Sequence, residues 1–286
     1  MAATSHKTAF TLCFLQIVLL LFITASHAYA DHFHKDKYKE KNQILFDQIW
    51  AQAFEKLENQ RDKNEGVVFY SGFAMWGGER WSLGDAEKIG TAFEKFYDDS
   101  QHVKFIFSNE EENNLPKDYP TVMDDIFREH FARLSIEAKE TDLVVVGLYS
   151  HGDKGKLSRR LGSKYKDYML VGKLKRFMLP LKNHNVLLII SACYSGSFIE
   201  KLKNEKHVIA TAAAKDKTSN GCSPLHHQTY YGQALVEAFK SYSDDTEKDI
   251  LNVLKSAVGI INKKEKWKKD KSEPQLFVGD EFNISM

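Results

Sequence analysis

Two apolar stretches that end in reactive side chains decide the fold, and they read LVVVGLYSHGD at residues 143–153 and VLLIISACYSGS at residues 186–197. Continuous apolar runs of this kind are typical of strands that are buried on both faces of a parallel sheet. The carboxyl ends of such strands form the edge where α/β proteins bind ligands. If these two strands are neighbours, we expect His151 and Cys193 to meet at that edge.

The sequence on either side of these stretches alternates short apolar runs with longer segments of helical spacing. This alternation predicts one α/β domain with a mostly parallel central sheet and helices on both faces. Residues 72–84 are expected to form a Gly/Trp-rich loop. The other expected strands are 67–70, 103–107, 207–214 and 275–278, and the expected helices are 85–97, 121–138, 232–242 and 249–261.

Residues 153–176, directly after the first decisive strand, are rich in Lys and Arg. We interpret them as a solvated loop and the outer face of a helix. Two alternatives stay open. The stretch could attract acidic substrates to the catalytic edge, or it could be a cleavable activation loop.

The N-terminus has the features of a signal peptide over residues 1–30. Its apolar run at residues 12–23 is too short to span a bilayer, and Ala28-Tyr29-Ala30 is a small-x-small cleavage site. We therefore expect a secreted or periplasmic protein after cleavage near Ala30. An uncleaved anchor is the alternative, and it is the one case in which we expect membrane contact. Residues 31–66 then form an amphipathic helical leader before the main domain at residues 67–280.

The composition excludes several classes of protein. The 286 residues carry 40 Lys and Arg against 39 Asp and Glu, a net charge of +1, which gives no reason to expect a nucleic-acid partner. Three cysteines are too few for a disulfide scaffold. Since Cys13 leaves with the signal peptide, Cys193 and Cys222 either pair with each other or one of them is chemically active.

The residues at the two strand ends predict acyl transfer from an amide through a thioester. Cys193 opens a segment expected to be helical, and a helix N-terminus lowers the pKa of a thiol and favours thiolate. His151 can act as general base and then as general acid to the leaving amine. The backbone N–H groups of Gly152 and Cys193 can hold the oxyanion of the tetrahedral intermediate.

The joint pattern of Ser-His-Gly and Ser-Ala-Cys-Tyr-Ser-Gly-Ser resembles the legumain (asparaginyl endopeptidase) family of the caspase-like cysteine peptidase clan. It is most similar to the compact secreted bacterial members. The segments TSNGCS at residues 218–223, TYYG at 229–232 and PQLFVG at 274–279 carry the resemblance onward. The resemblance covers roughly residues 67–279 and implies a three-layer caspase-like fold. The implied activity is that of a thiol protease acting on peptides or proteins, with no cofactor and no metal.

The same resemblance assigns roles to individual residues. Cys193 matches the nucleophile, His151 the catalytic base and Gly152 the oxyanion partner. Asn-selective members carry acidic side chains at the positions of Ser191 and Gln233, so specificity for Asn is not expected here. The positions that the resemblance assigns to substrate binding are Ser191, Ser219, Gln233 and Arg80.

Two other functions stay open at this point. A transpeptidase or ligase would use the same thioester with an amine in place of water. A catalytically silent module would keep the peptide groove and lack turnover. In each case we expect the bound peptide to lie extended beside the strand that ends near Ala214.

Overall fold

The computed structural model describes residues 36–58, 66–98, 101–162, 165–223, 225–243 and 248–284. The expected signal peptide at residues 1–30 lies outside these residues, so its cleavage and the export of the chain stay predictions. Within the described part of the chain, no helix combines the length and the apolar character needed to cross a membrane.

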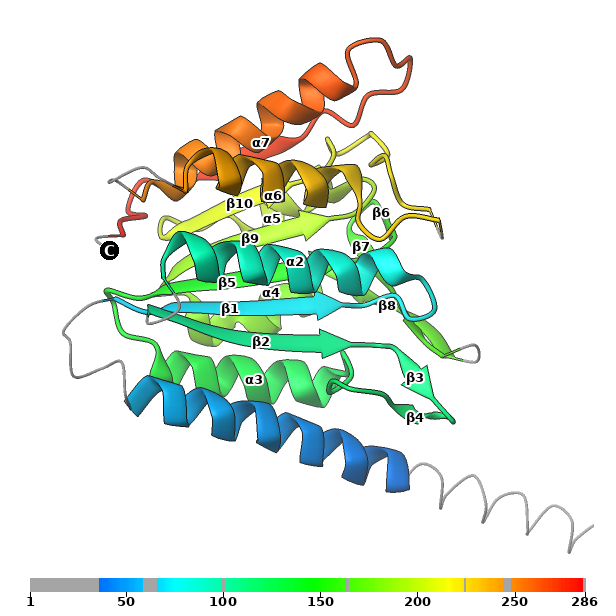
Figure 1. Cartoon of the computed structure of the whole chain (residues 1–286), viewed down its shortest axis with the longest axis vertical. Coiled ribbons are helices and arrows are strands. Elements are labelled where there is room, and N and C mark those ends of the chain that lie inside the picture. The colour runs from blue at the N-terminus through cyan, green and yellow to red at the C-terminus, as the bar shows by residue number, and fades with distance from the viewer. Residues whose placement is uncertain are drawn as a thin grey trace, which may run out of the picture.

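A six-stranded sheet forms the centre of the domain, in the order β11-β10-β9-β5-β1-β2 (Figure 1). Its strands are β1 (Val68–Ala74), β2 (His102–Ser108), β5 (Leu143–Tyr149), β9 (Asn185–Ser191), β10 (His207–Thr211) and β11 (Gln275–Val278). Neighbouring strands pair in parallel except β10 and β11, which are antiparallel. The predicted α/β class with a mostly parallel sheet is therefore confirmed.

Helices cover both faces of the sheet, because each strand directs alternate side chains to opposite faces. Val144 and Val146 of β5 belong to one core, whereas Leu143 and Val145 belong to the other. The first core is closed by the helix at residues 36–58, α3 (Asp124–Glu137) and α4 (Val171–Met178). The second core is closed by α2 (Arg80–Phe96), α6 (Tyr230–Ser241) and α7 (Ile250–Lys264). The result is three layers, with α2 and α6 in front of the sheet in Figure 1.

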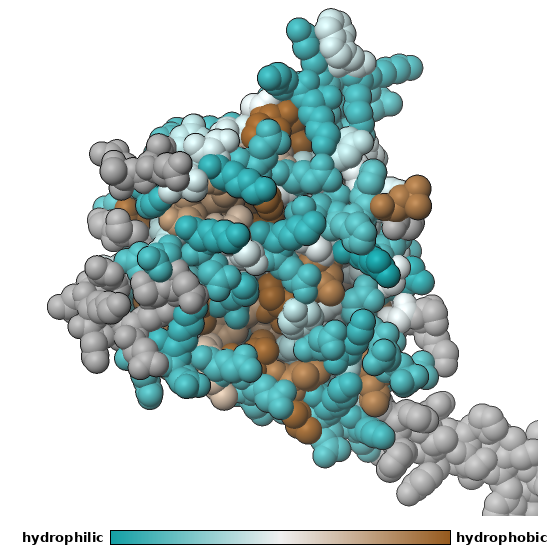
Figure 2. Space-filling view, viewed as in Figure 1, coloured by the Kyte–Doolittle hydropathy of each residue, from teal (hydrophilic) through white to brown (hydrophobic). Residues whose placement is uncertain are grey.

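The outer surfaces of the front helices are polar, as expected for amphipathic helices that bury one face. Figure 2 shows a mainly hydrophilic surface on this side of the molecule, with smaller apolar areas between hydrophilic side chains. The hydrophobic side chains of α2, α6 and α7 point instead into the core beneath.

The helix at residues 36–58 lies within the range expected for an amphipathic leader. Phe46 and Trp50 on this helix are fully buried and belong to the same core as α3 and α4. The Asn42 side-chain oxygen also accepts the backbone N–H of Thr121 at 2.6 Å. The helix therefore packs into the core of the domain and does more than cover its edge.

The expected loop at residues 72–84 is wrong at both ends. Strand β1 continues to Ala74, and α2 already begins at Arg80. The start of α2 gives no sequence signal, because Glu79 stands at the N-cap and makes no side-chain capping bond. Only a short connection therefore separates the strand from the helix, and this connection lies at the edge formed by the carboxyl ends of the parallel strands.

The interpretation of residues 153–176 as a solvated loop and helix face is also wrong in part. Most of the stretch forms a second, antiparallel sheet ahead of α4. Arg159 faces inward at 3% exposure and makes ion pairs with Asp124 and Asp167. Because its charge is neutralised there, Arg159 can be buried where an unpaired cation could not. The strands of this sheet are β6 (Gly152–Asp153), β7 (Lys156–Leu161) and β8 (Tyr165–Leu170).

The remaining elements are short. They are β3 (Glu111–Glu112), β4 (Leu115–Pro116), the 3₁₀ turns η3 (Leu179–Leu181) and η4 (Ser195–Phe198), and α5 (Ile199–Leu202).

Candidate active site

Strands β5 and β9 lie side by side, and Tyr149 pairs with Ser191 at their carboxyl ends. Beyond this pair the Ser150 N–H donates to the Ser191 carbonyl oxygen at 3.2 Å, so the two chains stay together past the strands. His151 and Cys193 each lie two residues beyond the pair. The two strands are therefore neighbours, as the sequence predicted, and they deliver both residues to one edge of the sheet.

Gly152 packs directly against the backbone of Cys193. A Cβ atom built on Gly152 would lie 2.5 Å from the Cys193 carbonyl oxygen, which is too close for any side chain. The Ser158 N–H donates to the His151 carbonyl oxygen at 2.8 Å, beside the pairing of Gly152 with Leu157. In antiparallel strands this pattern makes Gly152 and Leu157 a pair that exchanges no hydrogen bonds. The Gly152 N–H consequently points away from β7.

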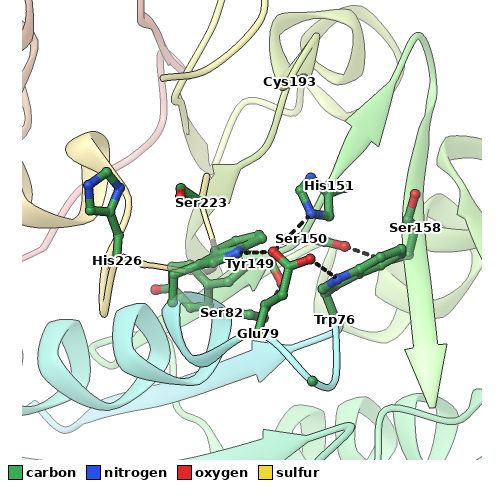
Figure 3. A network of polar contacts seen from close by, with 12 residues as sticks. Trp76, Glu79, Ser82, Tyr149, Ser150, His151, Ser158, Cys193, Ser223 and His226 are labelled. Carbon is green, nitrogen blue, oxygen red and sulfur yellow. Dashed lines mark hydrogen bonds and ion pairs between the residues drawn. The ribbon is translucent and has the colours of Figure 1, made fainter. Parts of the chain in front are cut away.

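The His151 ring lies beside Trp76 and Glu79 from the connection between β1 and α2 (Figure 3), and beside Trp81 at the start of α2. Its centroid is 4.7 Å from that of Trp76 and 5.1 Å from that of Trp81, and both indoles meet it edge to face. Its Nε2 atom lies 3.4 Å from Oε2 of Glu79. The side chain keeps 34% of its surface exposed, so the ring remains accessible to a substrate.

Glu79 accepts hydrogen bonds from two neighbouring indoles, and Figure 3 shows the one from Trp76. Trp81 Nε1 donates to Oε2 at 2.7 Å, and Trp76 Nε1 donates to Oε1 at 3.0 Å. Partial burial by itself raises the pKa of a carboxyl group. At Glu79 the bonds from Trp81 and Trp76, together with His151, outweigh burial and lower its pKa below the ordinary value. Glu79 is therefore a carboxylate at neutral pH.

The Cys193 thiol faces the chain that follows β10. The Ser219 N–H points at Cys193 Sγ, with 3.3 Å between nitrogen and sulfur. Sγ also lies 3.8 Å from the Ser219 carbonyl oxygen, which can accept the thiol proton in a weak hydrogen bond. Ser219, expected at the substrate site, is thus in direct contact with the expected nucleophile.

The expected lowering of the Cys193 pKa is wrong. Burial raises the pKa of this thiol, and the hydrogen bond from the Ser219 N–H offsets only part of the increase. The expected helix dipole is weak here, because Cys193 is followed by the 3₁₀ turn η4 and by α5, which has only 4 residues. The resting group is therefore a thiol rather than a thiolate.

The turn after Cys193 is sharp. Tyr194 adopts the left-handed region at φ 57°, which costs roughly 1 kcal/mol or more in a residue with a side chain. Its N–H is fixed by the Lys217 carbonyl oxygen at 2.7 Å. A Cβ atom on Gly196 would lie 2.7 Å from the Lys215 nitrogen, so this turn also requires glycine. Through these contacts the turn at residues 194–196 packs against the loop after β10.

Ser191 is fully buried beneath the site and contacts no solvent. Its hydroxyl lies 3.1 Å from Thr229 Oγ1 and donates to Asp85 Oδ2 at 3.4 Å. Asp85 is also fully buried, and it accepts the Thr229 N–H at 3.1 Å and the Thr229 hydroxyl at 2.7 Å. Burial raises the pKa of Asp85 to about 7. Ser191 can therefore act on a substrate pocket only through Thr229 and Asp85.

Among the described residues, no contact joins Gln233 or Arg80 to Cys193. Gln233 on α6 accepts a hydrogen bond from Lys264 at 3.0 Å and donates to the Gln228 carbonyl oxygen at 3.4 Å. Arg80 is exposed and lines a surface pocket of about 380 Å³ together with His227. The four expected substrate residues therefore occupy different environments, and Ser219 alone touches the thiol.

Both described cysteines are free thiols. Cys222 lies on the same loop as Ser219, and burial raises its pKa. The neighbouring Cys193, Asp85 and Glu79 raise it further, since each disfavours a second negative charge.

A peptide cannot pair with the chain at Ala214 as expected. Strand β10 already has β9 on one side and β11 on the other, and the Ala214 N–H donates to the Ser272 carbonyl oxygen at 2.9 Å. The strand also ends at Thr211. An extended substrate must therefore pair with another segment.

Comparison with known proteins identifies the family. The sequence model of the peptidase C13 family matches residues 118–280, more than half of the chain. The chain belongs to the peptidase C13 family. Peptidase C13 is the legumain family, so the family predicted from the motifs is confirmed, and the chain is a cysteine-type peptidase.

The other two comparisons add less. No curated protein matches this C13 chain. Among solved structures it is similar to the crystal structure of caspase-1 from Spodoptera frugiperda, at 14% sequence identity and a TM-score of 0.48. That match covers 75% of this chain and 85% of the caspase chain.

Sequence reasoning on this C13 peptidase missed three side chains that surround His151, namely Trp76, Glu79 and Trp81. All lie in the segment expected to be a loop, where no periodic pattern directs attention to single residues. Sequence reasoning also missed Asp85. This residue begins the expected helix at residues 85–97, where an acidic side chain in the first turn is common and draws no attention. The one available signal was the unusual pair of tryptophans on either side of a glutamate.

Proposed function

We propose that the chain is a cysteine endopeptidase in which Cys193 is the nucleophile and His151 is the general base and acid. The observation that carries the proposal is the placement of both residues at the ends of adjacent parallel strands, with Gly152 packed against the Cys193 backbone. Nucleophile and base must approach hydrogen-bonding distance for acyl transfer, and placement at neighbouring strand ends supports such an approach.

In the first step His151 takes the proton from the Cys193 thiol, and the sulfur attacks the carbonyl carbon of the scissile peptide bond. This proton transfer is required because burial keeps the resting group a thiol. The carbonyl oxygen gains the electron pair and becomes an oxyanion. The Gly152 N–H, which points away from β7, is one donor for that oxyanion, and the Cys193 N–H is the other.

In the second step the tetrahedral intermediate collapses and the carbon–nitrogen bond breaks. The protonated His151 gives its proton to the departing amine, which leaves a thioester on Cys193. Water then attacks the thioester, with His151 taking one of its protons. The products are a carboxylic acid and the regenerated thiol, so the cycle needs no cofactor and balances in atoms and protons.

The substrate backbone is proposed to run beside Ser219, the expected substrate residue in contact with the thiol. Ser191 and Gln233 are uncharged where Asn-selective relatives carry acids, so selectivity for Asn at P1 is not part of the proposal. Arg80 and Gln233 have no contact that links them to Cys193, and their expected role in substrate binding stays a hypothesis.

We also propose that the mature enzyme is exported, with cleavage near Ala30. The support is the apolar segment and small-x-small site of residues 1–30. Expression of the full chain in a secretory host, followed by N-terminal sequencing of the exported product, tests this. A product that begins at Asp31 supports the proposal, whereas a cell-retained chain with its original N-terminus contradicts it.

A positional-scanning library of internally quenched peptides tests the activity itself. Wild type should cleave a subset of the library, and Cys193→Ala and His151→Ala should lose that cleavage. Cys222→Ser is the matched control, because it removes the neighbouring buried thiol and should retain the wild-type rate. Cleavage that survives Cys193→Ala would disprove the assigned nucleophile, and a wild type inactive on every peptide would favour the silent peptide-binding module.

A further inference from the structure

We propose that Glu79 is a positioning residue for His151. Its carboxylate accepts the Nε2–H of the imidazole and thereby leaves Nδ1 as the atom that takes the Cys193 proton. The inference rests on the proposed function and deepens it, since it names the third member of the catalytic group. It starts from the 3.4 Å contact between Glu79 Oε2 and His151 Nε2.

The direction of this hydrogen bond follows from the protonation of Glu79. An ionised carboxylate has no hydrogen to donate, so it can only accept. The indole N–H groups of Trp81 and Trp76 each donate to it, which keeps it ionised. The hydrogen in the contact with His151 must therefore be on Nε2. In neutral imidazole the other nitrogen then carries the free lone pair, and that nitrogen is Nδ1.

The connection that carries Glu79 is held by backbone hydrogen bonds at Met75 and Gly77, which fix where Glu79 enters the site. The Met75 N–H donates to the Tyr149 carbonyl oxygen at 3.0 Å, and the Gly77 N–H donates to the Arg160 carbonyl oxygen at 2.9 Å. A Cβ atom on Gly77 would lie 2.0 Å from the Asn109 carbonyl oxygen, so this close approach requires glycine.

Strand β7 of the second sheet holds both His151 and the connection that carries Glu79. The Ser158 N–H on β7 bonds to the His151 carbonyl oxygen, and Arg160 on the same strand forms a β-bridge with Trp76. The imidazole also meets the Trp76 and Trp81 indoles edge to face. The Glu79 carboxylate, the His151 imidazole and the two indoles thus form one packed unit, in which Glu79 has fixed neighbours.

The charged and titratable groups around His151 come from four segments. Glu79 lies on the connection from β1 to α2, and Cys193 lies after β9. Cys222 on the loop after β10 interacts with both of them. From the second sheet, Arg160 and Lys166 lie over the Trp76 ring at 5.5 and 5.1 Å. Among these groups Glu79 is the one hydrogen-bonded to the imidazole, so its carboxylate is the group placed to orient the ring.

The pH–rate profile of Glu79→Gln provides the main test. Gln keeps the size of Glu and loses its charge. Because the imidazolium that forms in the first step loses its counter-charge, we expect kcat/KM on the pH plateau to fall by about tenfold. The acidic limb of the profile should move to lower pH, because Glu79→Gln removes the negative charge that faces the imidazolium. Glu94→Gln is the matched control on the helix that follows Glu79, where Glu94 pairs with Lys104 at the surface, and it should leave the profile unchanged.

A merely structural role for Glu79 would lower the rate and leave the acidic limb in place, and that result would overturn the proposal. A second measurement does not depend on the folding of any Glu79 variant. Nitrogen-15 chemical shifts of His151 in Cys193→Ala, recorded above the acidic limb, should place the ring hydrogen on Nε2. A hydrogen on Nδ1 would equally overturn the proposal.

These outcomes are separable from failure of the proposed function. If wild type has no Cys193-dependent cleavage, the endopeptidase proposal fails whatever the His151 tautomer. If wild type cleaves peptides and Glu79→Gln has the wild-type acidic limb, only the role of Glu79 fails.

Discussion

The backbones of Gly152 and Cys193 are packed so closely that no side chain fits between them. A Cβ atom on Gly152 would lie 2.5 Å from the Cys193 carbonyl oxygen and 2.9 Å from the Ala192 Cβ. The residue after His151 thus touches the segment of Cys193 directly. The backbone packing just beyond β5 and β9 therefore fixes how closely these two segments approach.

Gly152→Ala should separate the two catalytic segments. Displacements of about 1 Å cost roughly a hundredfold in reactions that depend on near-attack geometry, so we expect a loss of about that size in kcat/KM. Gly172→Ala is the control, because a Cβ atom there meets nothing within 4 Å. Steady-state kinetics of both variants check this, and a fully active Gly152→Ala enzyme would show that the contact is not needed.

Asp85 should make stability depend on pH. Its pKa of about 7 in the folded chain lies above its ordinary value because of burial. Between about pH 4 and pH 7 the folded chain keeps a proton that the unfolded chain releases, so its contribution to the free energy of unfolding falls as pH rises. The slope is at most about 1.4 kcal/mol per pH unit.

The Asp85→Asn variant isolates this contribution, because Asn stays neutral and still accepts from Thr229. We expect the stability of the variant relative to wild type to increase as pH rises from 4 to 7, measured by chemical denaturation. The exposed Asp216→Asn should give no such trend. A pH-independent difference between Asp85→Asn and wild type would mean that Asp85 has an ordinary titration.

Arg159 should stabilise the second sheet and, through it, the position of His151. Arg159→Ala leaves Asp124 and Asp167 without their buried partner. Because both carboxylates keep some exposure to water, we expect a loss of about 2 kcal/mol in the free energy of unfolding, below the range for a fully buried pair. Arg176→Ala on the exposed face of α4 should change stability by less than about 0.5 kcal/mol. Equal stabilities of the two variants would contradict the structural role of Arg159.

The two cysteines should resist simple alkylation at neutral pH. Burial raises the pKa of both Cys193 and Cys222, and the thiolate is the reactive form. The rate of iodoacetamide modification, followed separately at each residue by mass spectrometry, should keep rising above pH 9. A plateau for Cys193 below pH 8 would instead indicate a preformed thiolate, as the sequence alone had predicted.

The sequence predicted the centre of the fold well because buried parallel strands need continuous apolar runs. The bounds of β5 and β11 agree with the expected ranges, and the ends of β5 and β9 carry the two reactive residues. Such runs are local properties, so they can be read from one segment at a time.

The parts that were missed depend on contacts between distant segments. Burial of the Cys193 thiol follows from the loop after β10 packing on it. The Glu79 contact with His151 joins residues 72 positions apart, and no spacing rule connects them. Arg159 was read as a solvated charge because its partner Asp124 lies on another element. In each case the decisive partner becomes visible only when the chain is folded.

The central claim is that Cys193 is the nucleophile that forms the acyl-enzyme. Covalent labelling of that nucleophile tests the claim most directly, because its sulfur displaces the carboxylate of an acyloxymethyl ketone and forms a stable thioether. A peptide carrying a thiol-reactive acyloxymethyl ketone, chosen from the cleaved sequences, would be incubated with wild type, Cys193→Ala and Cys222→Ser, and the adduct located by peptide mass spectrometry. The account predicts one adduct on Cys193 in wild type and Cys222→Ser, and none in Cys193→Ala. An adduct on Cys222, or equal labelling of Cys193→Ala and wild type, would contradict it.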